Sequence, residues 1–190
     1  DLRKIYRKHG IRIDLWPHKL KHLRGAYFND DLGPTVMLAR GLPEDPFIFT
    51  MAHELKHHLV DRDKALAAYC DPSNEDDLVE KGAEVFAAEL IFPEGDFKLW
   101  LETTHVGKGE CTPPNLVKMK HETRTTLSYA GLAKRAERLG YAPFGSLEKI
   151  RWKKLEEEIY GEPTYKKILR YRQTARPKTI SRDPHIKQNE

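Results

Sequence analysis

The stretch Phe49–Asp61, FTMAHELKHHLVD, places ionisable side chains inside a segment with the apolar pattern of a buried helix. Five of the six residues from His53 to His58 are ionisable. Residues one helical turn apart project from the same face, so His53 and His57 share a face. The opposite face is apolar and consists of Ile48, Met51, Ala52, Leu55 and Leu59. We therefore predict an amphipathic helix with a specialised polar face.

The order His53-Glu54-Leu55-Lys56-His57 is an HExxH motif. Two histidines one turn apart can both reach a zinc ion through ring nitrogens, at roughly 2.0–2.1 Å. The neighbouring Glu is placed to act on a water bound to that metal without ligating it. Zinc lowers the pKa of such a water to about 7, which supplies hydroxide at neutral pH. We predict His53 and His57 as zinc ligands and Glu54 as the general base.

Two further polar residues of this helix receive structural interpretations. We expect His58 to be a partly exposed helix residue, because it lies off the face shared by His53 and His57. We expect Lys56 to lie at the surface or at the rim of the site, where it could also contact a substrate carboxylate or carbonyl.

A catalytic zinc has three protein ligands and one open position, so a third ligand must come from elsewhere. A second helix is predicted from about residue 74 to about residue 92, and it carries Asp76, Asp77, Glu80, Glu84 and Glu89. Glu80 and Glu84 share a face with two alanines, which would let this helix pack close to the first. Asp76 and Asp77 are expected to be solvated. The spacing alone leaves both Glu80 and Glu84 open as the third ligand.

The remaining elements are short. We predict a helix over residues 1–10, then strands over 11–16, 25–30 and 35–39, because these segments alternate or are bounded by turn residues. Asp45 fits an N-cap and Pro46 a first helical position of the motif helix. A loop is predicted over 105–115, and helices over 125–140 and 146–161. The fold class is therefore α+β.

The 190 residues suit one domain, which we expect over 1–170, with a C-terminal helical part from about 121. The basic stretch over 171–190 is predicted to be a flexible tail. No apolar run approaches the roughly 18 residues that span a bilayer, so no membrane attachment is expected. Two cysteines, Cys70 and Cys111, form no disulfide framework, which favours a cytoplasmic location. The first residue is Asp1 rather than Met, which leaves room for an upstream segment.

Three segments together resemble the ImmA/IrrE family of zinc metallopeptidases. They are FTMAHELKHHLV (49–60), EKGAEVFAAELIFP (80–93) and LSYAGLAKRAERLG (127–140). The resemblance extends over about 2–140 and implies a zincin-like fold, in which a small mixed sheet packs on the active-site helix, with additional C-terminal helices. It also implies the ligand set His53, His57 and Glu80, with Glu54 as the base. The family usually has Gly at the position of Lys56 and Asn at that of Glu84, and both departures bear on substrate preference.

We therefore predict a zinc-dependent endopeptidase, and the resemblance implies a helix-turn-helix repressor of the XRE type as its protein substrate. One alternative is a non-catalytic regulator that uses the zinc fold to bind a repressor or DNA. Another is zinc-dependent hydrolysis of a small molecule. A net charge of +4 permits nucleic-acid binding only weakly, because 33 basic residues are nearly matched by 29 acidic ones. Glu54 favours the enzyme, since a purely structural zinc site has no use for that base.

The helix over 125–140 is predicted to be a packing helix and not part of a DNA-binding domain, because a helix-turn-helix needs two helices and a tight turn.

For substrate binding and for oxyanion stabilisation, the sequence offers only candidates. A substrate backbone could add to the strand GAYF (25–28) or TVML (35–38). The side chains that could stabilise an oxyanion are Tyr27, His105, His121, Arg124 and Tyr129.

Overall fold

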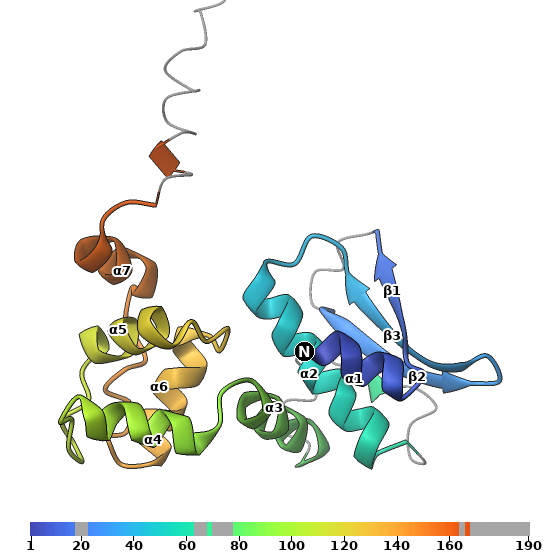
Figure 1. Cartoon of the computed structure of the whole chain (residues 1–190), viewed down its shortest axis with the longest axis horizontal. Helices are drawn as coiled ribbons and strands as arrows, with labels where there is room; N and C mark the ends of the chain where they lie inside the picture. Colours follow the sequence, from blue (N-terminus) through green and yellow to red (C-terminus); the bar gives the residue numbers. More distant parts are fainter. Residues whose placement is uncertain (18–22, 63–67, 70–77, 164–165, 168–190) are drawn as a thin grey trace, which may run out of the picture. The chain divides into compact units, whose positions relative to one another are not determined.

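The structure is a computed structural model, and it describes residues 1–17, 23–62, 68–69, 78–163 and 166–167. The chain divides into two units, one over Asp1–Ile150 and one over Arg151–Glu190. The first unit contains a small sheet and six helices of the described part, and the second contains one described helix (Figure 1).

Within the described residues the sheet has four strands, β1 (Arg12–Trp16), β2 (Gly25–Asp30), β3 (Gly33–Ala39) and β4 (Ala68–Tyr69). Their spatial order is β1-β3-β2-β4. β1 runs parallel to β3, whereas β2 runs antiparallel to both β3 and β4. Gly33, with a φ of 93°, opens β3 after the tight turn that joins it to β2. The three strands predicted from the sequence are confirmed, and the sheet is mixed, as expected.

The strand order bears on the idea that a substrate strand adds to GAYF or TVML. TVML belongs to β3, which is paired on both sides, so this half of the prediction is wrong. GAYF belongs to β2, which lies between β3 and β4 and pairs with β4 at Ala26 and Tyr27, so this candidate is not an edge strand either. Among the described strands, the edges of the sheet are β1 and β4.

Three helices pack on the sheet or on one another: α1 (Leu2–Lys8), α2 (Glu44–Val60) and α3 (Leu78–Ile91). α2 carries the HExxH motif and contacts α1, α3, β2 and β3 (Figure 1). The core between α1, α2 and the sheet consists of Tyr6, Ile11, Tyr27, Val36, Leu38, Met51 and Leu55, and Phe86 of α3 packs against it. The predicted α+β, zincin-like architecture is therefore confirmed, with the motif helix packed against the mixed sheet.

The start of α2 differs from the prediction. The helix begins at Glu44 with Pro43 as its N-cap, not at Pro46 after an Asp45 cap. Pro46 is tolerated inside the first turn, because the first amide groups of a helix have no intrahelical acceptor.

The first unit continues with α4 (Glu94–Thr103), α5 (Pro113–Thr123) and α6 (Tyr129–Arg138). The sequence pattern does not predict α4, and the prolines that open α5 lie in the segment predicted to be a loop. Proline is favoured at the first positions of a helix, and here the Thr112 amide donates to Asn115 Oδ1 at 2.8 Å. α6 is a packing helix, as predicted, because Leu132, Ala133, Arg135 and Ala136 are all buried.

Arg135 joins α6 to the end of α3. Its guanidinium donates to the carbonyl of Phe92 and lies 3.3 Å from Glu89 Oε2. The carbonyls at the end of a helix have no intrahelical donor, so the buried Arg135 satisfies one of them. This contact fixes the end of the helix that carries Glu80.

In the second unit the helix α7 (Trp152–Tyr160) starts six residues later than the helix predicted from residue 146. The tail predicted over 171–190 lies outside the described residues, and the single domain predicted over 1–170 stays a prediction. Among the described residues, no helix is both long enough and apolar enough to cross a membrane.

Candidate metal centre

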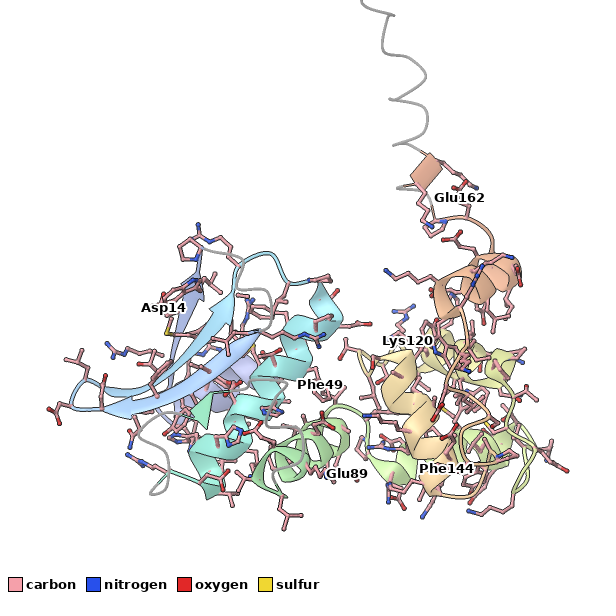
Figure 2. All side chains as sticks on the ribbon, turned by 180° about the vertical axis from the view of Figure 1, so that it is seen from behind. Asp14, Phe49, Glu89, Lys120, Phe144 and Glu162 are labelled. Atoms are coloured by element: carbon pink, nitrogen blue, oxygen red, sulfur yellow. The ribbon has the colours of Figure 1, made fainter. Side chains whose placement is uncertain are left out.

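Two histidines of α2 and one glutamate of α3 bring their donor atoms together. His53 Nε2 and His57 Nε2 are 3.2 Å apart. Glu80 lies beside both, with its Oε2 3.1 Å from His53 Nε2 and its Oε1 3.4 Å from His57 Nε2. Figure 2, where Phe49 marks α2 and Glu89 marks α3, shows these two helices side by side. The three side chains thus form one compact group of possible ligands.

The chemistry of this group fits a divalent cation. Two ring nitrogens and one carboxylate are a donor set found in catalytic zinc sites. Burial lowers the pKa of His53 to about 4, and the nearby charges of His57 and Lys56 lower it in the same direction. The imidazole of His53 is therefore neutral near pH 7, so it has a lone pair available for a metal.

Glu54, the predicted base, is fully buried on α2 next to His53. Burial and then the negative charge of Glu54 raise the pKa of Tyr6, whose hydroxyl donates to the Met51 carbonyl at 2.7 Å. The carboxylate of Glu54 therefore lies inside the unit, near the core packed between α1 and α2.

The space for this carboxylate depends on Gly25, at the start of β2. A β-carbon at this position would lie 2.4 Å from Thr50 Cγ2 and 3.0 Å from Glu54 Oε1. Any side chain here would displace one of these two residues of α2. The sequence does not predict this role of Gly25, because a glycine at the start of a strand usually indicates a turn.

Gly25→Ala is expected to destabilise the protein by about 1–3 kcal/mol, the usual range for overpacking a filled site. Urea denaturation would measure this loss. Gly95→Ala is the matched control, because Gly95 is exposed in α4 and no atom lies within 4 Å of the added carbon. Alanine is the better helix former, so the control should be neutral or slightly stabilising. A Gly25→Ala protein as stable as the parent would contradict the packing described here.

Asp61 contacts Nδ1 of the predicted metal ligand His57, the ring nitrogen that does not face Glu80. Its Oδ2 lies 2.9 Å from His57 Nδ1, and this contact leaves Nε2 of the ring facing Glu80. Burial raises the pKa of Asp61, but the hydrogen bonds and charges of Lys56 and His57 outweigh it, so the net shift is downward. Carboxylates commonly orient metal-binding histidines in this way. The available signal in the sequence was the spacing, since Asp61 follows His57 by four residues.

The structure corrects two expectations for α2. Lys56, expected at the surface or rim, is only 8% exposed, and its ammonium contacts Asp61 and α3. His58, expected to be partly exposed, is 5% exposed, and its Nδ1 lies 3.0 Å from the Tyr27 hydroxyl. The sheet covers one side of α2 and α3 covers another, so every residue from 50 to 58 is buried. The end of the helix emerges, and Leu59, expected on the buried face, is 45% exposed.

The other carboxylates of the second helix lie elsewhere. Glu84 is exposed and does not belong to the group formed by the three donors. Glu89 pairs with Arg135. Asp76 and Asp77 lie outside the described residues. The geometry thus places Glu80, and not Glu84, beside the two histidines.

The candidates for oxyanion stabilisation remain predictions. Tyr27 is buried, and its hydroxyl lies 3.0 Å from His58 Nδ1. Arg124, with a φ of 53°, follows α5 and lines a cavity of about 550 Å³ together with Trp100. The other three candidates are His105, His121 and Tyr129.

Two comparisons with known proteins were informative to different degrees. Among curated proteins, none shows a significant match to the chain. The model of the M78 peptidase family, described as the IrrE N-terminal-like domain, matches residues 6–135. This match includes the sheet, the HExxH helix α2, the helix α3 and most of α6. Because it covers well over half of the 190 residues, the chain belongs to this metallopeptidase family, and the resemblance to the ImmA/IrrE proteins is confirmed.

Proposed function

We propose that the protein is a zinc-dependent endopeptidase, in which His53, His57 and Glu80 hold the metal and Glu54 is the general base. The observation that carries this proposal is the convergence of three donor side chains next to a fully buried glutamate. A bound zinc ion would supply a Lewis acid that polarises the scissile carbonyl and a water made acidic near neutral pH.

The protein's own residues have separate tasks in this proposal. Glu54 accepts a proton from the attacking water and passes it to the leaving amine. Asp61 holds the ring of His57, so its Nε2 stays directed at the group. Gly25 leaves space for the carboxylate of Glu54, which fixes the direction in which that base can act.

The substrate we propose is a helix-turn-helix repressor of the XRE type, located with the protein in the cytoplasm. What supports this substrate is the resemblance to ImmA/IrrE proteins, whose characterised members cleave such repressors. The non-catalytic regulator explains the fold equally well, but it gives no reason for a buried Glu54 beside three possible metal ligands.

Incubation of the zinc-loaded protein with the helix-turn-helix protein encoded beside it, followed by intact mass analysis, tests the proposed substrate. We expect a defined pair of fragments whose masses sum to that of the repressor plus one water. An unfolded protein such as reduced casein serves as the control and should be cut more slowly. Equal rates on the repressor and on the unfolded control would contradict a regulatory role.

A further inference from the structure

The side chain of Lys56 crosses from α2 to the first turn of α3. Its ammonium donates to the carbonyl of Val79 at 2.8 Å. A β-carbon built on Gly82 would lie 3.6 Å from both Cε and Nζ of Lys56, so the chain end rests directly against this turn. Val79 immediately precedes Glu80, and Lys56 therefore contacts the backbone on which the third donor is mounted.

The same ammonium also reaches the residue that orients His57. Lys56 Nζ lies 2.6 Å from Asp61 Oδ2, and His57 Nδ1 lies 2.9 Å from the same oxygen. Both partners are enclosed, with Lys56 8% and Asp61 6% exposed. Through Asp61 and Val79, Lys56 is thus connected to two of the three donor residues.

The charges near this point explain why a buried cation is useful there. Glu54, Asp61 and Glu80 are three acidic side chains in or beside the group, and each contributes a negative charge when it is ionised. Lys56 compensates one of these charges, and a divalent cation compensates the other two. Burying a charge without compensation is strongly unfavourable. Without a metal, the enclosed carboxylates therefore depend on Lys56 more than they do with one.

We propose that Lys56 is a positioning residue that holds the site assembled in the metal-free protein, where its ammonium takes over part of the electrostatic role of the metal. This inference rests on the proposed zinc function. Before a metal binds, Lys56 keeps Asp61 directed at His57 and holds the first turn of α3, which carries Glu80, against α2. Once the metal is bound, it stabilises the same carboxylates and the contribution of Lys56 becomes smaller.

Lys56→Met tests this proposal, because methionine keeps most of the apolar chain but removes the charge and the hydrogen bonds. Tm is measured for each protein in the presence of a chelator and again with saturating zinc. We expect the metal-free Tm to fall by roughly 6 °C or more, as for a buried ion pair that loses one partner. The zinc-saturated Tm should fall by less than about half of this amount, so the rise in Tm that zinc produces becomes larger.

Hydrogen exchange of the metal-free protein supplies a local readout. In Lys56→Met the amides of residues 82–85, which donate to the carbonyls of the first turn of α3, should exchange faster, whereas those of α5 and α6 should not change. Lys118→Met is the matched control, because Lys118 has a 57% exposed side chain on α5. It should leave both Tm values and the exchange of residues 82–85 unchanged. Lys56→Arg keeps the cation, so its rise in Tm with zinc should return toward that of the parent.

Two results would overturn the proposal while the zinc function stands. Equal losses of Tm with and without zinc would mean that Lys56 is only a structural residue. A smaller rise with zinc in Lys56→Met would mean that Lys56 serves metal binding itself.

A Lys56→Met protein that folds only with zinc would be the strongest support. If Lys56→Met does not fold in either state, Lys56→Gln and Lys56→Arg decide, since only the Gln protein should show the enlarged rise. No effect of zinc on the parent would instead reject the zinc function, and this inference with it.

Discussion

Glu54→Gln is expected to lower kcat/KM for cleavage by about 10²–10⁴-fold, the usual contribution of a general base. The amide has nearly the shape of the carboxylate, so it fits the space that Gly25 leaves on β2. It cannot accept the proton of the attacking water, however. Because Glu54 is not one of the three converging donors, the zinc content should not change.

The measurement is the rate of repressor cleavage, read by intact mass, for the parent and the variant at equal zinc content. Glu84→Gln is the matched control, since it makes the same chemical change at an exposed position on the neighbouring helix α3. It should cleave like the parent. Undiminished cleavage by Glu54→Gln would exclude Glu54 as the base. Loss of cleavage with retained regulation of the target gene would favour the non-catalytic regulator.

The parts of this fold that could be predicted are those that depend on short-range patterns in the sequence. The two-residue alternation of 11–16 predicts β1, because successive side chains of a strand point to opposite faces, and the turn residues between 25–30 and 35–39 predict β2 and β3. The four-residue spacing of His53 and His57 places both rings on one helix face, where the structure has their Nε2 atoms 3.2 Å apart. Neither inference needs knowledge of what packs against the element.

The parts that were missed depend on contacts between distant segments. The helical pattern of α2 suggests one buried face, but the sheet and α3 together enclose the helix, so Lys56 and His58 are buried. The lack of a side chain at Gly25 matters only because Thr50 and Glu54, both from another element, lie against this position. Glu80 and Glu84 share a helix face, so which of them lies beside the histidines depends on the position of α3 along its own axis relative to α2, and the spacing alone cannot fix this position.

Glu80→Ala is expected to weaken zinc binding by far more than the roughly 10–100-fold that follows the loss of a residue supporting a ligand. The reason is that Glu80 supplies one of the three donors, with its oxygens 3.1 Å and 3.4 Å from the two histidine nitrogens. Glu84→Ala removes an exposed carboxylate one turn away and should leave the affinity unchanged. Lowering the pH should weaken zinc binding by the parent and by each variant that still binds zinc, because the ligating imidazoles must lose their protons. For His53, whose pKa burial lowers to about 4, protons compete only as the pH falls toward that value.

A zinc titration at pH 7.5 against a competing chelator, performed on the parent, Glu80→Ala and Glu84→Ala, tests the metal centre most directly. The predicted result is one zinc ion per chain for the parent and for Glu84→Ala with equal affinities, and a much weaker site in Glu80→Ala. Circular dichroism of the three metal-free proteins verifies that each is folded. A parent protein that binds no zinc, or a larger loss of affinity in Glu84→Ala than in Glu80→Ala, would contradict the assignment of His53, His57 and Glu80 as the metal ligands.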